Sequence, residues 1–187
     1  SKSGEFIIIY SEGHSSSDYQ ILKSDDLKGD FKNFTKRQKN HKYSIAHYEN
    51  KFYILTNLDA PNNRLMETST FETNQSNWEE IIAHRNEEQI LEMEVFSQHL
   101  VLNERIDGLS VLRVIKRDFE DDYYINFDEE SFSSWISRNR EFDTNILRYV
   151  YTSMTIPYST YDYDMNKKEK LLLKRQEVIG GYSDQEY

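Results

Sequence analysis

The stretch LRYVYTSMTIPYSTYDYDMNKKEKLLLKR, residues 147–175, contains three short segments rich in aromatic and large apolar residues. They are LRYVYTS (147–153), STYDYDM (159–165) and EKLLLKR (169–175), and they are separated by one turn around Pro157 and a second, polar turn at 166–168. Short runs of this composition between turn signals are typical of β-strands. The stretch therefore predicts three consecutive strands joined by short connections.

The same unit recurs along the whole chain. Phe6, Phe52, Leu100 and Tyr149 occupy equivalent positions, so the intervals are 46, 48 and 49 residues. The second strands are EFIIIY (5–10), KFYILTN (51–57) and HLVLNER (99–105); the third are DYQILKS (18–24), NRLMETS (63–69) and LSVLRVI (109–115); the fourth are FKNFTKR (31–37), WEEIIAHR (78–85) and DYYINFD (122–128). First strands, YSIAHY (43–48), ILEMEVF (90–96) and FSSWISR (132–138), precede all units except the first.

Four strands per unit at this period are typical of a β-propeller blade. The sequence therefore predicts an all-β fold, a partial β-propeller of about four blades of four-stranded antiparallel sheets, with the first blade incomplete. We expect the partial propeller to cover residues 1–176 and residues 177–187 to form a linker. The predicted blades are 1–40, 41–86, 87–128 and 129–176. A helix at 87–95 is the alternative there, but the repeat position favours a strand.

Several ordered motifs resemble the prolyl oligopeptidase family, specifically the end of the β-propeller in its trypsin-like oligopeptidase B branch. The segment 41–57, HKYSIAHYENKFYILTN, is similar to a strand pair of that family, and WEEII (78–82) and LVLNERIDGLSVLRVI (100–115) follow its pattern in order. The C-terminal signature comprises Ser153, Met154, Thr155, Pro157 and residues 161–165, 172–178 and 180–182. The resemblance covers nearly the whole chain.

The resemblance implies a serine peptidase that cleaves short peptides after Lys or Arg. Its Ser, Asp and His would lie in a following α/β-hydrolase domain, which we expect beyond Tyr187. The propeller would gate and size-select substrates, and this segment alone would be inactive. The alternative is a stand-alone propeller scaffold that binds peptides or proteins. A sugar-active propeller enzyme is a third hypothesis, which would require Asp162 or Asp164 to face a central funnel.

The residues themselves offer little catalytic chemistry. None of the six glycines forms a G-x-S-x-G motif, so the nucleophile elbow is missing from the sequence. His41 and His47 lie six residues apart, which places both on one face of a strand and within reach of one metal, but a third ligand at a suitable spacing is lacking. We therefore assign no catalytic, cofactor-binding or metal-binding residue and expect no cofactor.

Acidic residues gather in two places. Asp162 and Asp164 share one strand face, where each carboxylate would raise the pKa of the other if they were close; an ordinary solvated face is the plainer interpretation. Asp118, Glu120, Asp121 and Asp122, followed by residues 128–130, form an acidic run that predicts a turn, although such turns can bind Ca²⁺. Trp78 and Trp135 are interpreted as packing residues, and Lys36, Arg37, Lys39 and Lys42 as a solvated corner.

The net charge of −10 argues against nucleic-acid binding and would attract cationic peptides. No apolar run is long enough to cross a bilayer, so we expect no membrane partner. The lack of Cys fits a cytoplasmic or a periplasmic protein and does not decide between them. We also expect self-association of exposed terminal blades, through Phe6, Ile8 and Tyr10 or Ile7 and Ile9 in the first blade, and through Tyr149, Tyr151 and residues 171–173 in the last.

Overall fold

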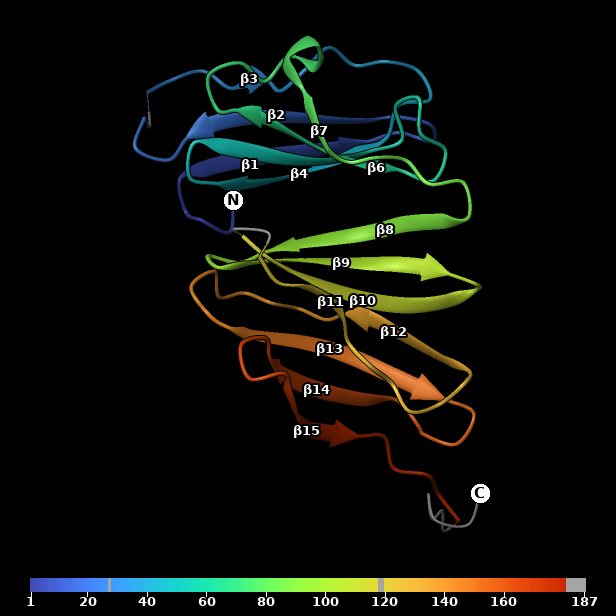
Figure 1. The fold of residues 1–187 in the computed structure, drawn as a ribbon. Coiled ribbons are helices and arrows are strands. Elements are labelled where there is room, and N and C mark those ends of the chain that lie inside the picture. Colours follow the sequence, from blue (N-terminus) through green and yellow to red (C-terminus); the bar gives the residue numbers. More distant parts are fainter. Residues whose placement is uncertain (27, 118–119, 181–187) are drawn as a thin grey trace. The chain divides into compact units, whose positions relative to one another are not determined.

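The computed structural model describes residues 1–26, 28–117 and 120–180, and within these residues the chain folds into antiparallel strands with one short 3-10 turn, η1, at Gln75–Asn77 (Figure 1). It divides into two compact units, Ser1–Ile90 and Leu91–Tyr187, which are described separately. The all-β prediction is confirmed. No helix of the described residues is long and apolar enough to cross a membrane.

The first unit contains two antiparallel sheets. The first sheet has three strands in sequence order, and the second has four. Their bounds are β1 (Phe6–Glu12), β2 (Ser17–Lys23) and β3 (Lys32–Asn33), then β4 (Tyr43–Tyr48), β5 (Lys51–Thr56), β6 (Arg64–Ser69) and β7 (Glu79–Ile82). The first sheet thus lacks one strand relative to the second, as the repeat predicts.

The second unit contains a sheet that follows the path β15-β14-β13-β12-β10-β9-β8, with β11 paired to β10. Its strands are β8 (Glu88–Val95), β9 (His99–Ile106), β10 (Leu109–Lys116), β11 (Asp122–Tyr124), β12 (Phe132–Ile136), β13 (Ile146–Ser153), β14 (Ser159–Asp164) and β15 (Glu169–Arg175). The helix considered at 87–95 is therefore a strand. Asp107 and Gly108 both have positive φ, 51° and 83°, as a tight hairpin between β9 and β10 requires.

A pair of serines joins the two four-stranded sets of this sheet. Ser110 in β10 and Ser133 in β12 form a parallel bridge. The Ser110 hydroxyl donates to the Ser134 carbonyl at 2.6 Å, and the Ser134 hydroxyl donates to the Ser110 carbonyl at 2.7 Å. The two four-stranded sets therefore connect at this bridge.

Each unit has its own aromatic core. In the first unit, the Phe34 ring meets the Phe52 ring edge-on, with centroids 5.1 Å apart, and both side chains are completely buried. In the second unit, the Tyr149 ring stacks on Tyr161 with centroids 5.4 Å apart. The remaining core members are Phe6, Ile21, Tyr43, Ile54, Met66 and Trp78 in the first unit, and Phe96, Val101, Leu112, Val114, Ile125, Ile136, Leu147, Tyr151, Tyr163 and Met165 in the second.

These cores correct part of the prediction about exposed terminal blades. Phe6, Tyr149 and Tyr151 are buried inside their own units, because alternate residues of β1 and β13 point inward. The exposed residues are their neighbours and the outermost strand: Ile7, Ile9, Tyr10, Leu171, Leu172 and Leu173. Ile8 is partly buried against the core of the first unit.

Successive strands of the second unit run in opposite directions, so their connections lie alternately at the two ends of the strands. Each row of strand ends is treated as one edge of the sheet. We call "exit edge" the edge that carries residues 107–108, 125–131, 154–158 and 176–180. Thr155 donates to Glu129 there at 2.7 Å, and the Gln176 amide donates to the Tyr158 carbonyl at 2.8 Å. The "far edge" carries residues 96–98, 137–145 and 165–168 and the turn between β10 and β11. Its turns meet through Ser97 and Asp143 at 2.8 Å.

Candidate functional site

The two histidines singled out by the sequence are both buried, and they have different neighbours. The His41 ring stacks on Tyr43, with centroids 4.9 Å apart, and its Nε2 lies 2.9 Å from the Thr56 hydroxyl. The His47 ring packs against Phe6 at 4.6 Å. Burial lowers the pKa of both imidazoles. The structure therefore gives each ring an aromatic environment of its own in place of a shared ligand.

His47 also forms a Ser–His pair. Its Nδ1 lies 2.7 Å from the Ser3 hydroxyl, the distance that a nucleophile and its general base would have. The other nitrogen, Nε2, is buried and has no hydrogen-bond partner among the described residues. A hydrolytic triad needs a carboxylate at that second position to orient the ring. This pair therefore does not form the Ser-His-Asp arrangement.

Carboxylates of the acidic run near β11 form hydrogen bonds and ion pairs with basic and hydroxyl side chains. Asp122 accepts two hydrogen bonds from Arg113, and Asp121 pairs with Lys168 at 3.0 Å. Glu129 accepts a hydrogen bond from the Thr155 hydroxyl at the exit edge. Within residues 1–26, 28–117 and 120–180, no three His, Asp or Glu side chains are grouped as a metal site would require. Asp118 and Phe119 lie outside the described residues, as do Gly181 and Tyr182 of the C-terminal signature.

The two aspartates of β14 each accept hydrogen bonds from nearby donors. Asp162 accepts two parallel hydrogen bonds from Arg148 on β13, at 2.7 and 2.8 Å. Asp164 caps the following turn by accepting the amides of Asn166 and Lys167, both at 3.0 Å. These amides, the Lys167 amide foremost, lower the pKa of Asp164. A raised pKa, which the sequence suggested only if the two carboxylates were close, is therefore not found for Asp164.

A pocket lies at the far edge of the second unit. The loop between β12 and β13 forms it together with the start of β13 and one residue of β14. Three of its lining residues are arginines: Arg138 and Arg140 in the loop and Arg148 on β13. Its other lining residues are Ser137, Asn139, Glu141, Thr144, Ile146 and Asp162.

The loop that forms the pocket is held by side-chain hydrogen bonds. The Asn139 amide donates to the carbonyls of Ser137 and Arg148, at 2.8 and 3.0 Å, and its oxygen accepts the Arg148 amide at 2.8 Å. At the other end of the loop, the Thr144 hydroxyl accepts the Ile146 amide at 3.1 Å. The loop is therefore held between its two arginines by Asn139 and, where it enters β13, by Thr144.

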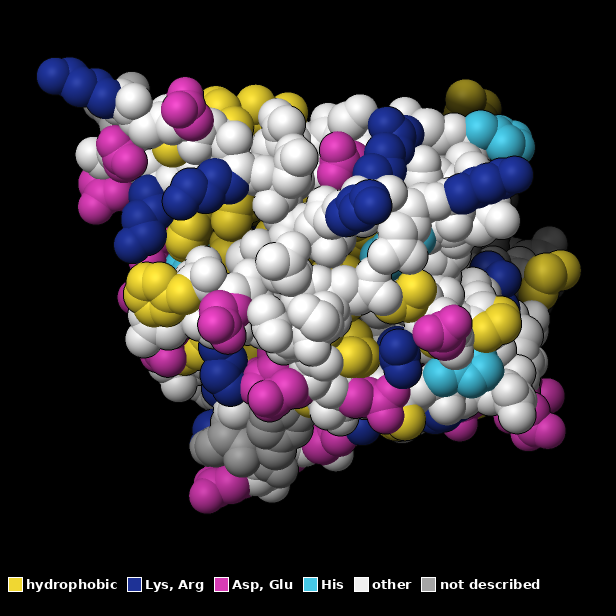
Figure 2. All heavy atoms as spheres, turned by 90° about the horizontal axis from the view of Figure 1, so that it is seen from above, with side chains coloured by type: hydrophobic (Ala, Val, Ile, Leu, Met, Phe, Trp, Pro, Cys, Tyr) yellow, Lys and Arg dark blue, Asp and Glu magenta, His cyan; other side chains and the backbone are white. Residues whose placement is uncertain are grey.

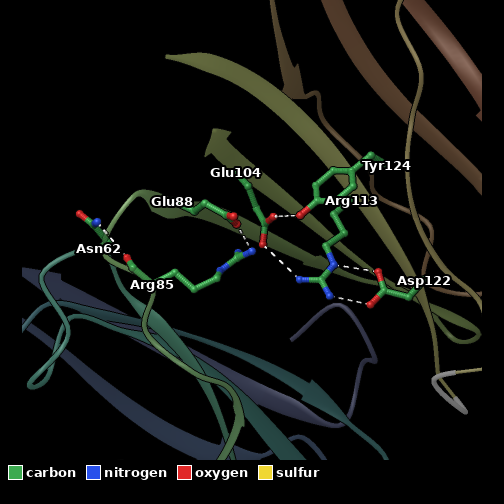
Figure 3. Close-up of polar contacts among 7 residues, drawn as sticks. All are labelled: Asn62, Arg85, Glu88, Glu104, Arg113, Asp122 and Tyr124. Atoms are coloured by element: carbon green, nitrogen blue, oxygen red, sulfur yellow. Dashed lines mark hydrogen bonds and ion pairs between the residues drawn. The ribbon is translucent and has the colours of Figure 1, made fainter. Parts of the chain in front are cut away.

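A second polar cluster lies on β9, β10 and β11, on the sheet face opposite the core of the second unit (Figure 3). The side chain of Glu104 is completely buried, and it accepts a hydrogen bond from the Tyr124 hydroxyl at 2.7 Å. Arg113 lies 3.5 Å from Glu104 and donates to Asp122 at 2.7 and 2.5 Å. These contacts, the Asp122 bond foremost, raise the pKa of Arg113. The cluster keeps a buried carboxylate compensated, which is what its burial requires.

The first unit has its own polar cluster where the chain leaves β7. Arg85 forms an ion pair with Glu88, three residues later (Figure 3). The Asn62 amide donates to the carbonyls of Arg85 and Asn86, at 3.0 and 2.7 Å. These bonds fix the connection between β7 and the start of β8. Their role is structural, since they satisfy loop carbonyls that no strand partner reaches.

Both tryptophans pack against neighbouring side chains, and all four residues of the basic corner are exposed. Trp78 directly precedes β7 and belongs to the core of the first unit, whereas Trp135 lies within β12 and packs on Tyr158 at 5.5 Å. They therefore occupy different strand positions. In the basic corner, Lys42 pairs with Glu12 at 2.9 Å. One face of the molecule shows charged side chains of both signs interspersed (Figure 2).

The sequence reasoning missed both the arginine pocket and the buried Glu104. Two signals were present. The run Arg138-Asn139-Arg140-Glu141 follows a strand directly, and Glu104 lies in a second strand directly after the apolar residues 100–102 and Asn103. Neither signal identifies a partner, because the groups that approach these residues come from other strands.

Comparison with known proteins places the described geometry in context. Residues 1–176 match the family described as "Prolyl oligopeptidase, N-terminal beta-propeller domain". Over 96% of its length the chain is 34% identical to dipeptidyl aminopeptidase BI of Pseudoxanthomonas mexicana, and over its whole length it is 26% identical to protease 2 of Moraxella lacunata. The chain spans 25% and 26% of these relatives, so it corresponds to about a quarter of their length.

Solved structures show the same likeness. Oligopeptidase B from Trypanosoma brucei, in a closed form with covalently bound antipain, is 26% identical with a TM-score of 0.87, and the alignment covers 99% of this chain and 28% of that one. Oligopeptidase B from Leishmania major has the same TM-score at 20% identity, over 99% and 28% of the two chains, which supports the fold.

Proposed function

The chain belongs to the prolyl oligopeptidase family, whose N-terminal β-propeller domain it matches, and we propose on this basis that it is the non-catalytic propeller part of an oligopeptidase B-like serine peptidase. The reaction is cleavage of short peptides after Lys or Arg. One observation carries the proposal: 99% of the chain aligns with oligopeptidase B from Trypanosoma brucei at a TM-score of 0.87 and 26% identity. Protease 2 of Moraxella lacunata supports it over the full length of this chain.

The chemistry is assigned to a hydrolase domain of the longer protein. This chain contains no G-x-S-x-G, and its Ser3–His47 pair has no carboxylate on the second imidazole nitrogen among the described residues. Its buried His41 and His47 have lowered pKa values because burial disfavours their charged forms. The proposed catalytic Ser, Asp and His therefore come from outside residues 1–187.

The propeller's own role is to restrict access. A rigid antiparallel β-structure beside an active site excludes folded proteins and admits short, extended peptides, and separation of the two domains gates their entry. The net charge of −10 gives the domain a field that attracts cationic peptides, which are the substrates of this proposal. Such attraction weakens with salt, because ions screen exposed charges beyond about 10 Å at 0.1 M ionic strength.

A second specificity is favoured by one relative. The dipeptidyl aminopeptidase BI of Pseudoxanthomonas mexicana is 34% identical over 96% of this chain, a higher identity than that of protease 2. Removal of dipeptides from a free amino terminus is therefore the alternative activity. Both activities need the same acyl-transfer chemistry and differ in whether the substrate's amino group must be free.

The test uses the full-length protein that contains this chain, assayed with two fluorogenic peptides that end in Arg. One is blocked at its amino terminus, and the other is a free dipeptide. Turnover of the blocked peptide supports the oligopeptidase B-like proposal, and turnover of the free dipeptide alone supports the aminopeptidase alternative. The 187-residue chain, checked for strand content by circular dichroism, should match buffer with both peptides.

Size selection is tested separately. The full-length protein should cleave a short Arg-containing peptide but leave the same sequence intact within a folded protein. Equal cleavage of both would contradict the access-restricting role of the propeller. A full-length protein that cleaves neither fluorogenic peptide would favour the scaffold alternative, in which the propeller binds partners without chemistry.

A further inference from the structure

We propose that the pocket lined by Arg138, Arg140 and Arg148 at the far edge of the second unit binds the carboxylate of a peptide's C-terminal residue. This would be a peptide-binding site separate from the reaction assigned above, and it does not depend on the Lys or Arg preference. The lining residues all belong to the second unit.

Two of the three guanidinium groups are available to a ligand. Arg148 is engaged by Asp162 through two hydrogen bonds. Arg138 and Arg140 are exposed, and neither has a hydrogen-bond or ion-pair partner within the part of the chain that the structure describes. A guanidinium presents a planar set of N–H donors that matches the two oxygens of a carboxylate.

The lining of the pocket carries a positive charge, whereas the chain as a whole is acidic. Its lining contains three arginines and two acids, Glu141 and Asp162, and Asp162 is already paired with Arg148. The whole chain carries a net charge of −10, with 33 Asp and Glu residues against 23 Lys and Arg residues. Arg138 and Arg140 lie two residues apart in the loop and both line the pocket, so together they form a local site for an anion.

The remaining lining favours an organic carboxylate over inorganic phosphate. Ile146 contributes a partly exposed apolar side chain, which a C-terminal residue's side chain can contact and a phosphate cannot. The Thr144 hydroxyl and the Ser137 residue add polar groups beside it. The loop is held by the Asn139 hydrogen bonds to Ser137 and Arg148, so the arginines project from a fixed backbone.

The experiment measures binding by titration calorimetry to the full-length protein at low ionic strength. The probe is the tripeptide Gly-Ala-Leu as its free acid, which has no basic residue. The same tripeptide as its C-terminal amide, sodium acetate and inorganic phosphate are the comparison ligands. We expect the free acid to bind most tightly, and the amide to bind at least about tenfold more weakly because it has lost the charged acceptor.

The variant Arg138→Gln/Arg140→Gln should weaken binding of the free acid by about tenfold or more and leave the circular dichroism spectrum unchanged. The matched control is Lys36→Gln/Lys39→Gln, which removes the same charge from two exposed residues of the first unit and should leave binding unchanged. The proposal is overturned if the amide binds as well as the free acid, if phosphate binds more tightly, or if both double variants weaken binding equally. None of these outcomes depends on peptidase activity, so a failure of the proposed function is seen separately in the cleavage assay.

Discussion

Arg148 and Asp162 face each other across β13 and β14 and form two parallel hydrogen bonds, with Nε and Nη2 of the guanidinium 2.7 and 2.8 Å from the carboxylate oxygens. The pair lies on the face opposite the core, because its strand neighbours Leu147, Tyr149 and Tyr163 point inward. It raises the pKa of Arg148 and gives Asp162 a structural partner. Asp162 is therefore one half of a cross-strand ion pair and not a member of an acidic site.

Replacing Asp162 by Asn should cost little stability. The side chain of Arg148 is 46% exposed, and ion pairs that water reaches contribute about 0–1 kcal/mol. We expect the free energy of unfolding, measured by urea denaturation, to fall by no more than about 1 kcal/mol. The loss should shrink further in 1 M salt. A loss of several kcal/mol would show that the pair is more strongly desolvated than its exposure indicates.

Changes in the Glu104 cluster should be much larger. Glu104 is completely buried, so Glu104→Ala leaves Arg113 without one of its anionic neighbours and should reduce the free energy of unfolding by about 3–5 kcal/mol. Tyr124→Phe removes only the 2.7 Å hydrogen bond and should cost about 1 kcal/mol. The matched measurement is urea denaturation of both variants and of the double variant. If the two single losses are simply additive, Tyr124 and Glu104 are not energetically coupled.

The buried histidines should make the protein less stable in acid. Burial lowers the pKa of His41, His47 and His99 in the folded state. The unfolded chain then binds protons at a pH near 6.5, where the folded imidazoles remain neutral. Stability is therefore fully present above about pH 6.5 and is lost as the pH falls through the folded pKa values.

His41→Gln tests this dependence, because Gln can still hydrogen-bond Thr56 but cannot take up a proton. The difference in unfolding free energy between pH 7.5 and pH 5 should be smaller in this variant than in the wild type. His14→Gln, at an exposed position, is the control and should leave the difference unchanged. An unchanged pH dependence in the His41 variant would contradict the assignment.

Self-association remains a prediction, now restricted to those members of the predicted set that are exposed. Leu171 pairs with Asp162 and so points to the sheet face opposite the core, where it is 64% exposed, and Leu173 is 44% exposed. Complete burial of a leucine stabilises by roughly 1.5–3 kcal/mol, so two copies of the chain gain by covering this face. Sedimentation velocity at micromolar concentrations should show dimers or larger species for the 187-residue chain.

Leu171→Lys should shift that equilibrium to the monomer. The control is Phe71→Lys, which makes the same kind of change at a residue that is 79% exposed but lies in the turn between β6 and β7. This control should leave association intact. A wild-type chain that sediments strictly as a monomer would rule out the predicted association.

The strands and their period were predictable from the sequence because side-chain alternation is local. The interval from Phe6 to Phe52, Leu100 and Tyr149 identified equivalent strands, and the ordered motifs around them indicated the family. The hairpin at Asp107-Gly108 is equally local, since it depends on two adjacent residues that both adopt positive φ. These properties need only a few neighbouring residues, so they are visible before any strand has found its partner.

Partner choice was decided by tertiary structure alone. The register of β13 against β14 pairs Arg148 with Asp162, and the approach of β10 to β12 brings Ser110 to Ser134. The same packing buries Tyr149 and leaves Leu171 in water, although both belong to the aromatic and apolar pattern of one repeat. The physical reason is that burial and pairing depend on which strand lies alongside, and residues far apart in the chain meet only when their backbones are held in a particular register.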